Sequence, residues 1–76
     1  MTRLRDNDTV RLRRECRGLH PKTDLEVTLP VGSVGTVIES MSPATVIVEF
    51  LSADGDVRAW ASIDVEHLER TGPPWD

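Results

Sequence analysis

Apolar and polar residues alternate along several short segments of the chain, which is the period-two pattern of a β-strand with one buried face. In the first segment Val10 and Leu12 share one face, and the arginines on either side of Leu12 share the other. The last segment also fits a helical turn. The pattern predicts an all-β fold with five short strands, at residues 8–13, 34–39, 45–51, 57–62 and 65–69.

The connections between these segments contain the residues that turns require. Asp54 and Gly55 predict a tight hairpin, because this pair tolerates the positive φ angles of such turns. A long polar connection follows the first strand, from residue 14 to about residue 32. Apolar and polar residues alternate within it at residues 25–29, so part of this connection is expected to form a short extended arm.

The order of these features is typical of a small SH3-like barrel. Five short strands are predicted, with a long loop after the first strand and a tight hairpin between the third and the fourth. Closing such a small sheet into a barrel removes its unpaired edges. We expect a single domain over residues 1–76, with a barrel core at about residues 8–70 and a C-terminal tail at residues 71–76. The predicted core is largely aliphatic and consists of Val10, Leu12, Val34, Val37, Ile38, Val46, Val48, Phe50, Val57, Ile63 and Leu68.

Length and composition narrow the classes of function. Seventy-six residues leave little room for a wide substrate cleft or a buried cofactor. No apolar stretch approaches the roughly 20 residues of a membrane-spanning helix, and no apolar segment of a secretory signal follows the first charges, so no membrane partner is expected. The single cysteine, Cys16, excludes an internal disulfide, which favours a reducing, cytoplasmic location.

Charge is divided unevenly along the chain. Residues 1–22 carry seven basic and three acidic side chains, a net +4, whereas residues 23–76 carry two and ten, a net −8. The overall charge of −4 argues against a generally basic nucleic-acid binder, and the aromatic residues on which bases stack are not interleaved with the cations. The N-terminal arginines either form an RNA-binding stripe or pair with the protein's own carboxylates; they are Arg3, Arg5, Arg11, Arg13, Arg14 and Arg17.

Several motifs resemble those of known families. They are Asp8-Thr-Val-Arg-Leu12, Leu29-Pro-Val-Gly-Ser-Val-Gly-Thr-Val37, and Val48-Glu-Phe50 followed by Asp54-Gly55. Over residues 6–70 the chain resembles an uncharacterised bacterial family of small SH3-like proteins, known only as a domain of unknown function. The order of elements is also similar to the SH3-like domain of the nitrile hydratase β subunit, at Val10 to Arg13, His20-Pro21 and Gly32 to Val37. That enzyme holds its metal on cysteines of its other subunit, so this resemblance implies a helper or partner role without catalysis.

The sequence contains no arrangement of residues typical of a catalytic or metal site. Gly32-Ser-Val-Gly35 predicts a structural turn, because a strand follows it and a phosphate-binding loop precedes a helix. Cys16 and His20 are spaced C-x₃-H, but with the distant His67 they do not complete a zinc ligand set. We therefore expect no enzymatic activity, no metal and no cofactor. The paired carboxylates fall in predicted turns, where Asp is common, and are Asp54 with Asp56 and Asp64 with Glu66.

Trp60 is the candidate anchor of a partner-binding surface. It alternates with one valine and two alanines at residues 57–62, so it faces outward, beside Arg58, if the small apolar residues face the core. In the alternative, Trp60 fills the core and the alanines face water. Exposed Trp and Arg are enriched in interface hot spots. We predict that the chain binds a protein partner or itself, in an accessory, immunity or antitoxin-like role, through Trp60, Arg58, Arg11 and Arg13.

Other interpretations of the function remain open. One is binding of RNA or single-stranded nucleic acid by the N-terminal arginine stripe, and another is a nitrile-hydratase-like accessory protein that works with a cysteine-bearing partner. Trp75, in the proline-rich tail, is either a tether that folds back on the barrel or an anchor for a partner.

Overall fold

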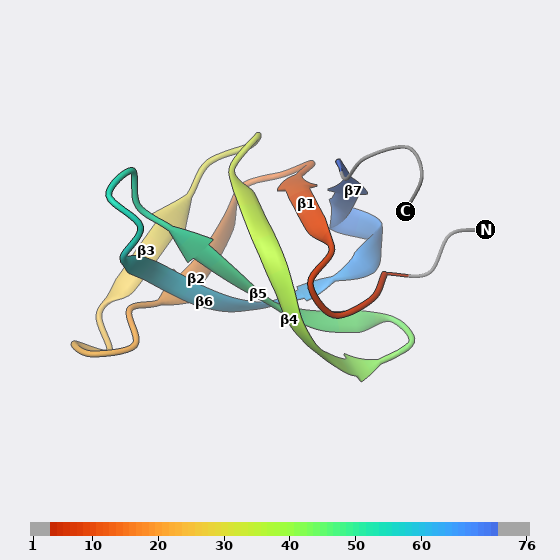
Figure 1. The fold of residues 1–76 in the computed structure, drawn as a ribbon, viewed down its shortest axis with the longest axis horizontal. Helices are drawn as coiled ribbons and strands as arrows, with labels where there is room; N and C mark the ends of the chain where they lie inside the picture. The colour runs from red at the N-terminus through yellow and green to blue at the C-terminus, as the bar shows by residue number, and fades with distance from the viewer. Residues whose placement is uncertain (1–3, 72–76) are drawn as a thin grey trace.

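The computed structural model describes residues 4–71, in which the regular structure is β-strand apart from one turn of 3-10 helix (Figure 1). Seven antiparallel strands form one sheet in the order β3-β2-β6-β5-β4-β1-β7, with β3 and β7 at its edges. The prediction of an all-β fold is confirmed. The elements are β1 (Thr9–Leu12), β2 (Cys16–Leu19), β3 (Glu26–Leu29), β4 (Val34–Ser42), β5 (Thr45–Leu51), β6 (Val57–Asp64), the 3-10 turn η1 (Val65–His67) and β7 (Leu68–Arg70).

The predicted long connection contains a hairpin of β2 and β3, and the extended arm expected at residues 25–29 is confirmed as β3, whereas β2 was not predicted. The five predicted strands correspond to β1, β4, β5, β6 and β7. Strands β2 and β3 follow β1 along the chain and precede β4, and they pair with each other. Leu19 of β2 then joins this hairpin to β6 through Trp60. The prediction of five strands is therefore wrong, because Gly18 occupies the inward position of β2 and hides its alternation.

Position 18 has no space for a side chain because β6 passes directly over it. A Cβ atom at this position would lie 2.7 Å from the backbone oxygen of Trp60 and 3.3 Å from the Cβ atoms of Ala59 and Ala61. A contact below 3.0 Å with backbone requires the strands to separate. The close approach of β2 to β6 therefore depends on glycine in one strand and alanines in the other.

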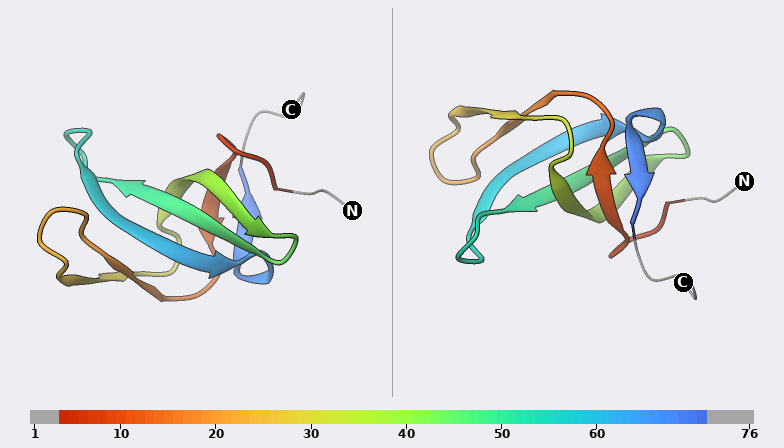
Figure 2. Two further views of the ribbon diagram at one scale, coloured as in Figure 1. Left: turned by 90° about the horizontal axis from the view of Figure 1, so that it is seen from below. Right: turned by 90° about the horizontal axis from the view of Figure 1, so that it is seen from above.

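The sheet curls on itself, as the views from below and from above in Figure 2 show. Register shifts occur in β4 between Val37 and Glu39 and between Ser40 and Ser42, opposite β5. A further shift separates Phe50 from Leu51 where β5 meets β6. Such bulges increase the local twist and bend a strand. The irregular residues at these register shifts therefore bend the strands, and the bends curve the sheet around its core.

Two turns carry glycines with positive φ angles. Gly55 has a φ of 91° in the β5–β6 hairpin, and Ser52 N–H donates to the Asp56 carbonyl across it at 2.8 Å, which confirms the hairpin predicted at Asp54 and Gly55. Gly32 has a φ of 88° immediately before β4. The Gly32 N–H donates to the Leu12 carbonyl at 2.9 Å, so this turn joins β4 to the end of β1.

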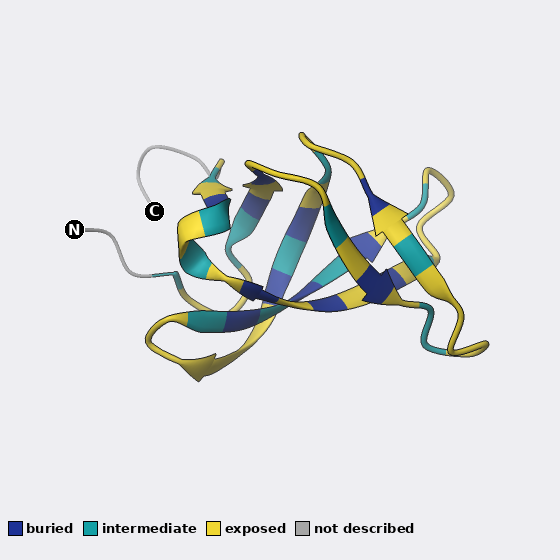
Figure 3. Cartoon of the chain, turned by 180° about the vertical axis from the view of Figure 1, so that it is seen from behind, coloured by how far each residue is buried: buried dark blue, intermediate teal, exposed yellow. Residues whose placement is uncertain are grey.

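Buried residues line the inner face of the curled sheet and alternate with exposed residues along β6 (Figure 3). The predictions for Val34, Ile38 and Val57 are wrong, because the first two are 55% and 38% exposed and the third is half-buried. Gly35 and Val37 take the inward positions of β4, which turns Val34 outward. The observed core is Val10, Leu12, Leu29, Val37, Val46, Val48, Phe50, Ala59, Ala61, Ile63 and Leu68.

The two ends of the described chain lie side by side. Strand β1 pairs with β7 through the register partners Arg11 and Glu69, and the Thr71 N–H donates to the Thr9 carbonyl at 2.9 Å. The basic first strand is therefore adjacent to an acidic residue from the end of the chain. Within residues 4–71 no helix is long and apolar enough to cross a membrane.

Candidate functional site

Trp60 lies on the outer face of β6 with 45% of its surface exposed. Its neighbours Ala59 and Ala61 are buried on the inner face, where Gly18 packs against them. The inner face at this point has room only for small side chains. The outward orientation predicted for Trp60 is therefore observed, and the alternative in which it fills the core is not.

Trp60 stands in a row of register partners that crosses six strands. Leu19 and Trp60 are the apolar pair in the middle of this row, and partners on one face of a sheet have Cβ atoms about 5 Å apart. Leu19 is 53% exposed, so the pair forms an apolar patch open to water. The row consists of Glu26, Leu19, Trp60, Glu49, Thr36 and Thr9.

Polar neighbours hold and flank this apolar pair. The indole Nε1–H of Trp60 donates to Glu49 Oε2 at 3.0 Å, which orients the ring on the sheet. Arg58 is exposed two residues earlier on the same face of β6, and in residues 4–71 its guanidinium has no ion-pair partner. We call Leu19, Glu49, Arg58 and Trp60 the Trp60 surface.

Arg11 and Arg13, predicted to belong to the same surface, lie elsewhere. Arg11 is on the outer face of β1, and β4 and β5 separate β1 from β6 in the sheet. Arg13 follows β1 and lines a groove at the end of the sheet, beside Leu4, Ser42 and Val46. The structure therefore places the four predicted residues on two different parts of the molecule.

Part of the N-terminal arginine stripe is engaged in ion pairs. Arg11 Nη2 lies 2.8 Å from Glu69 Oε1, and Arg17 Nη1 lies 3.2 Å from Glu26 Oε1. These contacts match the interpretation in which the arginines pair with the protein's own carboxylates. Arg3 lies outside the described residues, as does Trp75.

The Arg11–Glu69 pair is expected to contribute little to stability. Both side chains are about half exposed, at 47% and 48%, and such pairs are worth about 0.2–1 kcal/mol. A double-mutant cycle with Arg11→Ala and Glu69→Ala, measured by urea unfolding, should give a coupling energy in this range that falls as salt is added. A coupling above about 2 kcal/mol would contradict this expectation.

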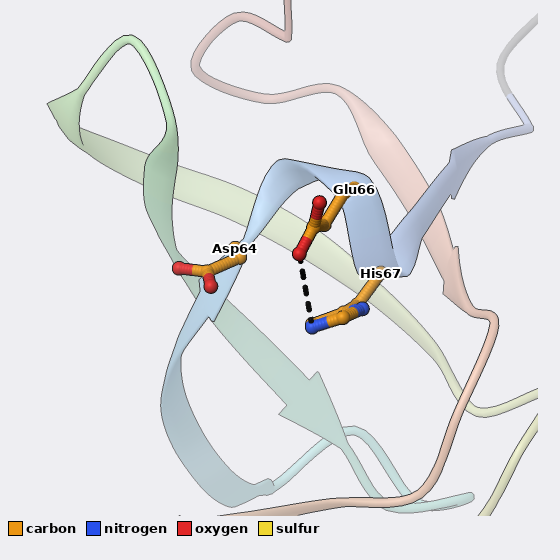
Figure 4. Close-up of side chains that lie close together, drawn as sticks. All are labelled: Asp64, Glu66 and His67. Carbon is orange, nitrogen blue, oxygen red and sulfur yellow. Dashed lines mark ion pairs between the residues drawn. The ribbon is translucent and has the colours of Figure 1, made fainter.

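A second cluster lies on the turn that leads into β7 (Figure 4). Asp64 precedes η1, Glu66 lies within it and His67 ends it. Glu66 Oε1 approaches His67 Nε2 at 3.7 Å, and the donor atoms of all three residues lie within 4.8 Å of one another. In the sequence, Asp64 and Glu66 match only the preference of acidic residues for turns. Their proximity to His67 depends on the helical turn, and the pattern there fits a strand equally well.

Cys16 and His20 do not form a site together. Cys16 begins the extended strand β2, and four extended residues span about 13 Å, so the C-x₃-H spacing holds the two side chains apart. The His20 Nδ1 atom accepts a hydrogen bond from the Lys22 N–H at 3.2 Å in the β2–β3 turn. Burial raises the pKa of the half-buried Cys16 thiol, with Arg14 acting in the opposite direction, so the thiol stays protonated at neutral pH.

Comparisons with known proteins gave no match: no protein-family model, no curated protein and no solved structure matches the chain. The resemblance to small SH3-like proteins therefore stays a prediction. The structure offers two candidate functional sites, the Trp60 surface and the cluster of Asp64, Glu66 and His67.

Proposed function

We propose that the chain is a non-enzymatic protein-binding module with an SH3-like barrel fold, and that the Trp60 surface is its docking face. The curled antiparallel sheet, in which the first and last strands pair, supports the fold. The exposed Trp60–Leu19 pair is the single observation that carries the function. A reducing, cytoplasmic compartment belongs to the same proposal, because Cys16 is a single free thiol.

The position of Trp60 suits an interface anchor. A Trp side chain buries about 150–250 Å² when a partner covers it, and Trp is among the residues most enriched in hot spots. The hydrogen bond to Glu49 holds the indole in one orientation before binding. Less side-chain entropy is then lost when a partner docks.

The charges around the apolar pair indicate the chemistry of the partner. Arg17 pairs with Glu26, whereas no carboxylate of the described residues forms an ion pair with Arg58, which is the exposed cation beside Trp60. A complementary protein surface places an apolar side chain over Trp60 and Leu19 and a carboxylate opposite Arg58. Accessory, immunity and antitoxin-like roles all use such one-to-one docking.

Trp60→Ala is expected to weaken partner binding by about 2 kcal/mol or more, close to 30-fold in Kd, because it removes the anchor of the surface. Proteins that co-purify from the source cells should be identified by mass spectrometry, and self-association should be measured by analytical ultracentrifugation. Val34→Ala is the matched control, since Val34 is 55% exposed on β4 and lies outside the surface. Thermal melting should show both variants folded.

The results separate the possible functions. Loss of a stoichiometric partner, or of a dimer, in Trp60→Ala but not in Val34→Ala supports the proposal. A partner retained by Trp60→Ala, or the absence of both a partner and self-association, overturns it.

Nucleic-acid binding through the arginine stripe is the alternative function. Arg13 and Arg14 are exposed and have no ion pair within the described residues, which favours it, whereas Arg11 and Arg17 face carboxylates. Nucleic acid in the purified material that dissociates steeply with salt would support this alternative. A cysteine-bearing partner protein would instead support the nitrile-hydratase-like accessory role.

A further inference from the structure

The turn that carries Asp64, Glu66 and His67 is held in place by hydrogen bonds from three parts of the chain. The Val65 N–H donates to the Ala44 carbonyl at 2.8 Å, and the Arg13 N–H donates to the His67 carbonyl at 2.8 Å. The Leu68 N–H closes the turn on the Val65 carbonyl. The backbone positions of all three side chains are therefore fixed by the fold.

The carboxylate of Asp64 has no structural role within the turn. It precedes η1 as the N-cap residue but makes no capping hydrogen bond to the backbone. Its Oδ1 atom accepts a hydrogen bond from Thr45 Oγ1 at 3.1 Å, across the β5–β6 pairing. A hydrogen bond of this kind orients a carboxylate that binds a metal and leaves its other oxygen available.

The distance between Glu66 and His67 is too long for a direct hydrogen bond. His67 Nε2 and Glu66 Oε1 are 3.7 Å apart, which is beyond the 2.7–3.2 Å of an N–H···O hydrogen bond. Two ligands of one tetrahedral Zn²⁺ ion lie about 3.4 Å apart, since Zn–N and Zn–O bonds are about 2.0–2.2 Å long. The three donor atoms lie within 4.8 Å of one another, so each pair has to approach by at most about 1.4 Å to reach this spacing.

The donor set selects a class of metal. Two carboxylates and one imidazole suit borderline first-row divalent ions such as Zn²⁺ or Co²⁺, and the imidazole disfavours Ca²⁺, which takes oxygen ligands. Two negative charges also balance one divalent cation. The protonated Cys16 thiol lines the adjacent pocket with Asp64 and His67 but is not counted as a ligand.

We propose that Asp64, Glu66 and His67 bind one first-row divalent metal ion, with Zn²⁺ the reference case, through three protein ligands and at least one position open to water. The site is independent of the Trp60 surface. It differs from the expectation of no metal, which considered Cys16, His20 and His67 as ligands, because the 3-10 turn brings Asp64 close to the consecutive residues Glu66 and His67. Arg14 lines the pocket beside Asp64 and His67, and its positive charge opposes binding of a cation.

Isothermal titration calorimetry of the untagged protein with ZnCl₂ tests the site. The chain contains only two histidines, so replacing each in turn shows which one binds the metal. Wild-type protein should bind one Zn²⁺ ion, and His67→Ala should bind it at least tenfold more weakly. His20→Ala, which removes the other histidine, should leave the affinity unchanged. Asp64→Asn and Glu66→Gln keep the shape of the side chains and should each weaken binding at least tenfold.

Further measurements keep the test decisive if a variant loses stability. Arg14→Ala should tighten Zn²⁺ binding several-fold, a gain of function that unfolding cannot produce. Co²⁺ should give visible absorption bands of a low-symmetry site in the wild type and in His20→Ala but not in His67→Ala. Failure to saturate at 1 mM ZnCl₂, or equal losses in His20→Ala and His67→Ala, would overturn the proposal.

Discussion

Phe50→Ala is expected to lower the free energy of unfolding by about 3–5 kcal/mol, the usual cost of removing a buried phenylalanine ring. Phe50 is the one phenylalanine of the chain and is 2% exposed. It lies on the inner face of β5 opposite Ala59, and its ring also faces Gly35 of β4. Because both neighbours are small, neither can fill the cavity that the substitution leaves.

Urea unfolding followed by circular dichroism measures this loss, and the melting temperature should fall by at least about 12 °C. Leu51→Ala is the matched control on the next residue of the strand. Leu51 is 50% exposed, so its truncation should cost less than about 1 kcal/mol. Similar losses in the two variants would mean that Phe50 is not the centre of the core.

Gly35→Ala is expected to destabilise the fold by about 3 kcal/mol, for the opposite reason, because it adds an atom where no space exists. A Cβ atom at this position would lie 2.6 Å from Val48 Cγ1, 2.9 Å from the Glu49 carbonyl oxygen and 3.0 Å from Phe50 Cδ1. One of these atoms is backbone, so a side-chain rotation cannot relieve the contact. Strands β4 and β5 must move apart.

Gly32→Ala separates this steric effect from the conformational freedom of glycine. Gly32 has a φ of 88° and no heavy atom within 4 Å of a Cβ placed on it. Its replacement should cost only about 1 kcal/mol, through backbone strain alone. Both variants should be compared by the same urea unfolding measurement. A smaller loss in Gly35→Ala than in Gly32→Ala would show that β4 adapts to the added methyl group.

The two glycines in strands also explain where sequence analysis failed. Gly18 and Gly35 each occupy an inward position of a strand. A glycine there stands where the alternating pattern requires a large apolar side chain, so the pattern is interrupted. The pattern therefore predicts a loop where β2 lies, and in β4 it predicts that Val34 belongs to the core. Both errors arise because the close approach of a neighbouring strand, which requires glycine, leaves no mark on hydrophobic periodicity.

The candidate sites differ in how far they could be anticipated. The alternation places Trp60 on the face opposite Ala59 and Ala61, and the packing of Gly18 against the two alanines shows that Trp60 is on the outer face. Leu19 and Glu49 could not be predicted as its neighbours, since strand register depends on pairing between residues 11 or more positions apart. The ion pair that draws Arg11 to Glu69 likewise joins residues 58 positions apart.

The sequence alone predicted the all-β class, five of the seven strands and the β5–β6 hairpin, and it indicated an extended segment at β3. These features depend on local chemistry, namely the period of apolar side chains and the φ angles that glycine allows. Only the folded structure shows that β2 and β3 join the sheet and which arginines are paired. These features depend on contacts between strands that are distant in the sequence, and periodicity along the chain does not encode them. Asp64, Glu66 and His67 are close in the sequence, but their proximity depends on the 3-10 turn, which the pattern did not distinguish from a strand.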